Sequence, residues 1–184
     1  MVAVALLMAI IVVLQLLAGY IRIGVLPISL VLLPVVLGAA MFGPGTGAFL
    51  GGVFGAIVFL CCVFGIDIGG AMVLQANPIL CFIVVMGKGI LAGAASGFVY
   101  KALKNKNRYA AMLLSAIVCP VVNTGVFIAC MFLFFGEVLA SWAGGSDVVA
   151  YVLSSLVLMN FLPELVINIL FSPASVRISE KVKM

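Results

Sequence analysis

Two ionisable side chains lie in stretches of sequence that are otherwise apolar. Lys88 stands between residues 84–87 and 89–92, which are all apolar or glycine, and Glu164 lies in a similar run near the end of the chain. A charged side chain at the centre of a bilayer costs about 2.5–3.5 kcal/mol on insertion scales unless it is paired or faces water. The two residues therefore predict a polar binding site, a structural ion pair in which they neutralise each other, or both.

The composition assigns the chain to the membrane. Hydrophobic residues make up 67% of the 184 residues and charged residues 8%, and the mean hydropathy is +1.48. A typical soluble domain is about 45–50% apolar and about 25% charged. Apolar runs of about 20 residues span a bilayer as helices, whereas barrels show short alternating segments, which this sequence lacks. We therefore predict an all-α integral membrane protein with one domain over residues 1–184 and no nucleic-acid partner.

Glycine, proline and charged residues divide the chain into six predicted spans. Residues 43–47 contain three glycines and a proline and predict a tight turn. The segments at 66–78 and 136–150 are predicted as loops, and the tail after Pro173 is polar. The spans are predicted at about residues 2–19, 27–42, 48–65, 79–100, 109–135 and 151–171.

The basic residues predict the orientation, because cytoplasmic loops of membrane proteins carry an excess of Lys and Arg. With six spans, the loop after span four and the tail after span six lie on one side of the membrane. That side carries Lys101, Lys104, Lys106, Arg108, Arg177, Lys181 and Lys183, whereas the opposite side carries Arg22. Both termini are therefore predicted to be cytoplasmic.

The sequence offers little for catalysis or metal binding. It has no histidine, and Cys61, Cys62, Cys81, Cys119 and Cys130 are odd in number and show no Cys-x-x-Cys spacing. We interpret the cysteines as small hydrophobic residues in helix packing. Clustered carboxylates and nucleophile–base pairs are also absent, so we predict a protein that is not an enzyme and has neither cofactor nor metal.

Depth along the spans predicts which polar side chains meet. Lys88 and Asn160 are each nine residues from the predicted outer end of their span, and Asn123 is twelve residues from its own. At about 1.5 Å per residue, all three lie roughly 14–18 Å below the outer boundary. Asn160 and Glu164 also share one helical face, because they are four residues apart. We predict a substrate site at Lys88, Asn123, Asn160 and Glu164, with the outer loops adding Arg22, Gln75 and Asn77.

Two stripes of glycine predict close helix contacts. Gly47, Gly51 and Gly55 recur every fourth residue in span three, and a second stripe at residues 89, 93 and 97 does so in span four. Helices in lipid associate where small residues let their backbones approach. We interpret both stripes as internal packing faces.

The order of several short motifs resembles one family of membrane proteins. Ala5 and Ala9 form an Ala-x-x-x-Ala pair in the first span, and proline- and glycine-containing stretches follow at 26–30, 34–39, 42–51 and 119–125. Together with six short spans, this set resembles the substrate-binding S components of energy-coupling factor (ECF) transporters over essentially the whole chain.

The resemblance implies a function and partners. S components bind a vitamin or related micronutrient outside the bacterial cell and dock on a transmembrane coupling protein that carries two cytoplasmic ATPases. The Ala-x-x-x-Ala face makes that contact in the family, so the resemblance assigns Ala5 and Ala9 to docking. The chain has no P-loop, as expected if its partners hydrolyse ATP. A multi-pass protein of the bacterial plasma membrane is therefore expected.

The charges of the predicted site indicate the substrate. Lys88 and Arg22 are cationic, so an anionic ligand is favoured. Among the vitamins of the family, pantothenate fits best because it is small, flexible and carboxylated, and the chain resembles the pantothenate branch. Other vitamins such as riboflavin or folate remain open. A stand-alone transporter, or a membrane assembly protein without catalytic function, also remains open.

Overall fold

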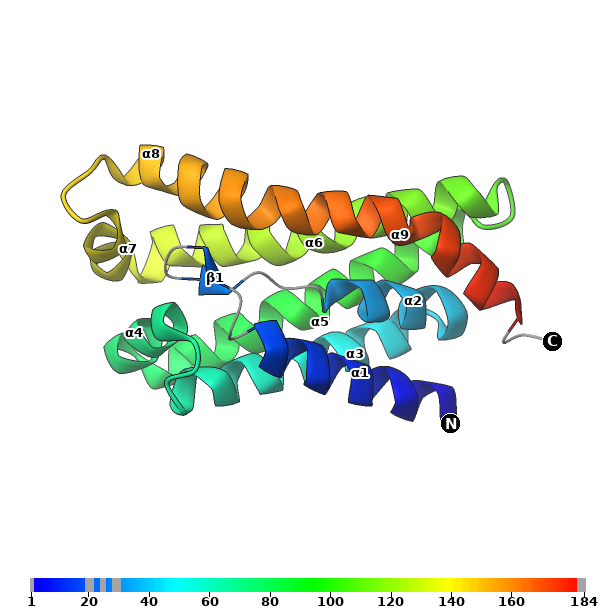
Figure 1. The fold of residues 1–184 in the computed structure, drawn as a ribbon, viewed down its shortest axis with the longest axis horizontal. Coiled ribbons are helices and arrows are strands. Elements are labelled where there is room, and N and C mark those ends of the chain that lie inside the picture. The colour runs from blue at the N-terminus through cyan, green and yellow to red at the C-terminus, as the bar shows by residue number, and fades with distance from the viewer. Residues whose placement is uncertain (1, 19–21, 24–25, 28–30, 182–184) are drawn as a thin grey trace.

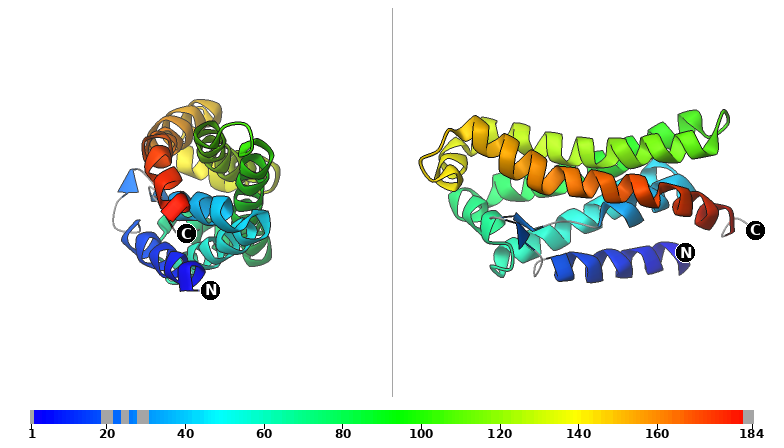
Figure 2. Two further views of the ribbon diagram at one scale, coloured as in Figure 1. Left: turned by 90° about the vertical axis from the view of Figure 1, so that its right-hand side faces the viewer. Right: turned by 45° about the horizontal axis from the view of Figure 1, so that its top comes forward.

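The computed structural model describes residues 2–18, 22–23, 26–27 and 31–181, which form an elongated bundle of helices (Figure 1). Long antiparallel helices run along the bundle axis, and Figure 2 shows them grouped around that axis in the end-on view. The exception to the helical fold is a small hairpin, in which β1 (Arg22–Ile23) pairs with β2 (Leu26–Pro27) in antiparallel register. The predicted all-helical class is therefore confirmed apart from these two short strands.

Within the described residues, four helices are long and apolar enough to cross a membrane. They are α3 (Pro44–Val63), α5 (Pro78–Leu103), α6 (Arg108–Phe134) and the continuous helix over Val148–Ser179. Two shorter apolar helices, α1 (Val2–Ala18) and α2 (Leu32–Phe42), correspond to the first two predicted spans. At about 1.5 Å per residue, the 11 residues of α2 cover about half of a hydrocarbon core.

The second predicted span was too long. It was expected over residues 27–42, but Pro27 belongs to β2 and α2 begins at Leu32. Strand pairing takes up the start of the predicted span, which hydropathy alone does not reveal. The predicted turn at 43–47 is also shorter than expected. Gly43 alone separates the two helices, and α3 begins directly at Pro44, a residue favoured in the first turn of a helix.

Two predicted loops contain helices. α4 (Ile68–Ala76) begins after Asp67, whose Oδ1 accepts a hydrogen bond of 2.9 Å from the Gly70 N–H. α7 (Gly136–Ala143) buries Leu139 and Trp142 against the bundle. A side-chain cap and a buried apolar face stabilise such short helices. The polar residues in these segments had suggested irregular loops instead.

The last long helix changes its hydrogen-bonding pattern midway. α8 (Val148–Tyr151) leads into η1 (Val152–Phe161), a π-helix, and α9 (Leu162–Lys181) follows. The Leu162 N–H donates to the Val157 carbonyl, five residues back. The change falls one residue before Pro163, which lacks the N–H needed for a regular α-helix.

The helix also extends beyond the predicted span end at residue 171. Pro173 lies inside α9, and the polar segment expected to be a tail continues the helix. Ser172, Ser175 and Ser179 are buried, and each hydroxyl donates to a carbonyl of its own helix. Packing of this small polar face keeps the segment helical.

The glycine stripes lie between α3 and α5, as predicted. A methyl group added at Gly51 would overlap the carbonyl of Gly89, and one added at Gly47 would overlap that of Gly93. A methyl group at Gly55 would meet the backbone of Val85. The two helices therefore touch through their backbones, and the interpretation of the stripes as internal packing faces is confirmed.

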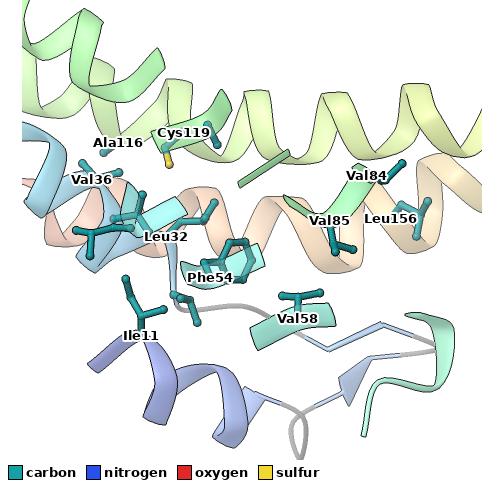
Figure 3. Close-up of a cluster of buried hydrophobic side chains, with 14 of the residues drawn as sticks. Ile11, Leu32, Val36, Phe54, Val58, Val84, Val85, Ala116, Cys119 and Leu156 are labelled. Atoms are coloured by element: carbon teal, nitrogen blue, oxygen red, sulfur yellow. The ribbon is translucent and has the colours of Figure 1, made fainter. Parts of the chain in front are cut away.

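The hydrophobic core runs along the bundle axis. Side chains from α1, α2, α3, α5, α6 and η1 contribute to it, and Figure 3 shows Phe54 among them, with Leu32 and Val58 nearby. Phe54, Val58, Val85 and Leu156 belong to this core and also line a cavity. The packed core thus forms part of the cavity wall.

Candidate binding cavity

A cavity of about 70 Å³ lies within the bundle, with walls from α1, α3, α4, α5, α6, η1 and α9. A buried water molecule needs about 10–15 Å³ on this measure, so the cavity has room for several. Its polar and charged lining residues are Gln15, Asp67, Lys88, Asn123, Thr124, Asn160 and Glu164. A largely apolar cavity with a few convergent polar groups is the usual form of a small-molecule site.

Lys88 is half-buried in α5, and its ammonium faces aromatic rings. Nζ lies 4.7 Å from the centroid of the Phe127 ring and 5.9 Å from that of Phe54. Such cation–π contacts stabilise an ammonium by roughly 0.5–2 kcal/mol, the higher figure applying where water is excluded. A ring face orients the cation without using its N–H donors, which remain available to an anionic ligand.

Glu164 and Asn123 are buried in the cavity wall, with 3% and 6% of their surface exposed. Glu164 Oε1 and Asn123 Oδ1 have no hydrogen-bond partner among the described residues. Glu164 Oε1 therefore makes no hydrogen bond to Lys88. A buried acceptor without a partner costs about 1–3 kcal/mol. Both residues belong to the lining of the cavity.

The buried polar side chains of the last long helix have two different surroundings. Asn160 in η1 and Glu164 in α9 both line the cavity. Asn168 is buried further along α9, where its Nδ2 donates to the Glu164 carbonyl over 2.8 Å. The structure thus brings Asn160, Glu164, Asn123 and Lys88 to one cavity, while Asn168 stabilises the helix beside it.

Two of the three residues predicted in the outer loops, Gln75 and Asn77, lie outside this cavity. Asn77 caps α5, because its Oδ1 accepts a hydrogen bond of 3.0 Å from the Leu80 N–H, and it borders a second hollow beside Phe135 and Glu137. Gln75 is exposed near the end of α4. Neither lines the cavity. Arg22 belongs to β1, but its side chain lies outside the described part of the structure.

Several lining residues were missed by the sequence analysis. Asp67 was expected in an outer loop, but it is 5% exposed and caps α4 at the cavity wall. Gln15 is buried on the same face of α1 as Leu7 and Ile11 and lines the cavity. A polar residue on the buried face of an apolar helix is the signal that could have found Gln15.

Sulfur, hydroxyl and aromatic groups complete the wall. The sequence analysis assigned Cys62 and Cys81 to packing and did not single out Thr124, Phe54 or Phe127; all five line the cavity. Their neighbours along the chain do not distinguish them from residues that face lipid. Among the described residues, no group of three or more His, Cys, Asp or Glu side chains is arranged to hold a metal ion.

The Ala-x-x-x-Ala pair lies on the outer side of α1. Ala5 and Ala9 are exposed, whereas Leu7, Ile11 and Gln15 on the opposite side are buried against the bundle. Small exposed side chains permit close approach of another helix in lipid.

Comparison with known proteins identifies relatives. The family described as "ECF transporter, substrate-specific component" matches residues 1–175 of this chain. The pantothenic acid transporter PanT of Lactococcus lactis subsp. cremoris is 30% identical over 184 aligned positions, which cover 94% of this chain and 89% of the relative. No solved structure is a significant match.

Proposed function

This chain belongs to the substrate-specific components of ECF transporters, and we propose that the substrate it captures is pantothenate. Components of this family are binding subunits of transporters and not enzymes. The family and the long apolar helices identify the chain as a multi-pass protein of the bacterial plasma membrane.

The observation that carries the substrate proposal is the ammonium of Lys88 inside the cavity. It faces the rings of Phe127 and Phe54, so its N–H donors are free to bind a carboxylate. In a site with little water, such a charge-assisted hydrogen bond is among the stronger polar contacts available to a ligand. Pantothenate carries one carboxylate on a flexible chain, and the relative from L. lactis is a pantothenic acid transporter.

The proposed contacts to pantothenate come from several helices. Lys88 binds the carboxylate, while Asn123, Asn160 and Glu164 contact the polar groups along the rest of the molecule. Phe54 and Phe127 pack on its apolar carbons. Arg22, Gln75 and Asn77 are proposed for the outer rim, where a substrate enters from outside the cell.

We further propose that the chain crosses the membrane six times with both termini in the cytoplasm. Figure 1 supports this orientation, because both ends of the chain and the basic turn between α5 and α6 lie at one end of the bundle, with α4 and α7 at the other. At 17 residues, α1 has about the minimum length of a spanning helix. α2 is assigned to the second crossing.

The proposed partners are a transmembrane coupling subunit and two cytoplasmic ATPases. Ala5 and Ala9 are exposed on α1, which fits a contact with a helix of the coupling subunit. Pantothenate would then be bound by this chain and released after ATP hydrolysis on the partners.

Equilibrium binding tests the substrate. Purified protein in detergent is titrated with radiolabelled pantothenate, and Lys88→Met is compared with Lys101→Met, a change at an exposed lysine outside the cavity. Losing the partner of a buried charge costs about 2–5 kcal/mol, so we expect Lys88→Met to weaken binding at least about thirtyfold. Lys101→Met should bind normally. Absence of saturable binding to the wild-type protein rules out pantothenate, and normal binding by Lys88→Met removes Lys88 from the site.

Co-purification tests the docking face. Ala9→Leu adds bulk to the exposed face of α1, and Ala129→Leu makes the same change at an exposed position of α6. We expect the first variant to lose the coupling subunit and ATPases while it still binds pantothenate, and the second to retain them. Equal recovery of the complex with both variants contradicts docking through α1.

A further inference from the structure

Two buried oxygens of the cavity wall are without partners. Asn123 Oδ1 comes from α6 and Glu164 Oε1 from α9, two helices that pack against each other. Phe127, which contacts the ammonium of Lys88, lies four residues after Asn123 on the same face of α6. The cavity thus has an ammonium from α5 and hydrogen-bond acceptors from α6 and α9.

We infer that Asn123 and Glu164 select ligands that bring hydroxyl or amide N–H donors together with a carboxylate. The inference rests on the proposed function of this cavity. It adds that a ligand must bring hydrogen-bond donors to the side of the cavity formed by α6 and α9. Pantothenate meets the requirement, because it carries hydroxyl groups and an amide N–H beside its carboxylate.

The physical reason is the cost of leaving buried acceptors unpaired. A carboxylic acid without further donors could bind Lys88, but it would leave the acceptor oxygens of Asn123 and Glu164 without a hydrogen bond. Sites built to hydrogen-bond a substrate reject analogues without the matching group much more strongly than apolar pockets reject an added methylene. Lys88 is the one cation among the described lining residues, so a ligand phosphorylated on its hydroxyl would bring a second anion into the cavity without a partner. The site should therefore also reject phosphorylated forms.

Asp67 does not provide the same acceptor function. Its carboxyl also lines the cavity, but its Oδ1 accepts the Gly70 N–H and caps α4. Substituting Asp67 would disturb the helix end as well as the cavity. Asn123 and Glu164 are better positions for testing selectivity, because Asn123 Oδ1 and Glu164 Oε1 make no hydrogen bond among the described residues.

The alternative is that Asn123 and Glu164 bridge helices, and the stability of the ligand-free protein separates the two roles. Replacing an unpaired buried acceptor by an apolar group of the same shape is nearly neutral or stabilising, whereas breaking a bridge is destabilising. Asn123→Leu and Glu164→Met are apolar replacements of similar size. Glu164→Gln keeps one acceptor oxygen and removes the ionisable carboxyl.

The experiment measures thermal unfolding and calorimetric binding for the wild type and these three variants. The probes are pantothenate, pantoate, β-alanine, hexanoate and 4′-phosphopantothenate. We expect the wild type to bind pantothenate, to bind pantoate more weakly, and to bind hexanoate and 4′-phosphopantothenate at least about a hundredfold more weakly. Asn123→Leu and Glu164→Met should each weaken pantothenate binding by about tenfold or more, without lowering the unfolding temperature of the ligand-free protein. Glu164→Gln, which keeps an amide oxygen as acceptor, should bind pantothenate more tightly than Glu164→Met does.

The outcomes distinguish this inference from the proposed substrate. In one outcome, the wild type binds pantothenate and the variants bind it equally well. In another, the variants lose stability without ligand but keep their affinity. In both cases the selectivity inference is wrong and the proposed function stands. If the wild type prefers another hydroxylated or amide-bearing carboxylate and the variants lose it, pantothenate is wrong and the inference stands. Preference for hexanoate, for β-alanine or for the phosphorylated form overturns the inference, as does failure to bind every probe.

Discussion

The ammonium of Lys88 lies 4.7 Å from the centroid of the Phe127 ring, so a cation on α5 is held by an aromatic face on α6. The contact orients a charged group without occupying its N–H donors. The carboxyls of Asp67 and Glu164 line the same cavity and interact electrostatically with this ammonium. We propose that the donors left unused by the ring bind an anionic ligand.

Phe127→Leu should therefore weaken pantothenate binding while Lys88 is retained. Loss of a cation–π contact of roughly 0.5–2 kcal/mol corresponds to about a two- to thirtyfold loss of affinity, because the ammonium is no longer oriented. Calorimetric titration measures the change. The control is Phe98→Leu, at an exposed phenylalanine on α5, which should bind normally. Equal affinities for the two variants would contradict a role for the ring.

Gly51→Ala and Gly52→Ala should differ sharply although the residues are adjacent in α3. A methyl group at Gly51 overlaps the Gly89 carbonyl, whereas at Gly52 it makes ordinary contact with Ile90, 3.5 Å from Cγ1. Overpacking typically costs about 1–3 kcal/mol, while alanine in an unhindered helix is more stable than glycine by about 0.5–1 kcal/mol. We expect Gly51→Ala to lower the unfolding temperature and Gly52→Ala to maintain or raise it. Similar temperatures would show that α3 and α5 separate easily.

Gly43→Ala should destabilise the junction of α2 and α3 through the backbone alone. Gly43 has φ 99° and ψ 178°, a conformation essentially restricted to glycine, yet an added methyl group would meet no atom within 4 Å. The expected loss in the free energy of unfolding is about 1–3 kcal/mol, measured by denaturation in mixed micelles. Gly87→Ala also enters open space but lies within α5, so it should not destabilise the protein. A junction that tolerates alanine would have to relax to another conformation.

Asn77→Ala should destabilise α5, because its Oδ1 accepts the Leu80 N–H at the start of that helix. Loss of such a cap costs about 0.5–2 kcal/mol, and Asn77→Asp should retain it. Thermal unfolding measures both changes, and equal stability of the two variants would show that the cap is unimportant. Pantothenate titration of Asn77→Asp tests the proposed contact at the outer rim separately, because the cap is preserved there.

The sequence by itself determined the class of the protein, the approximate extents of its long helices and the residues most costly to bury. Apolar length and composition decide whether a segment enters lipid, and both are properties of the chain alone. α5 and α6 begin within one residue of their predicted starts and end within three residues of their predicted ends. The glycine stripes were likewise predictable, because a spacing of four marks one helical face before its partner is known.

Depth along the helices was also a useful guide. Lys88, Asn123 and Asn160 were predicted at one level from their distances to span ends, and all three line one cavity. The calculation needs only the rise per residue. It says nothing about direction around the helix axis, so it missed Thr124, which is adjacent to Asn123 in the sequence and also faces the cavity.

Only the tertiary structure decided which helices meet around the polar groups and what each group contacts. Phe127 faces Lys88, Asp67 reaches the cavity wall from the start of α4, and Asn77 is directed to a helix end. These arrangements depend on the packing of segments far apart in sequence, and hydropathy contains no information about such pairs. The short α2 has the same origin, because strand pairing overrides local preference at the start of the predicted span.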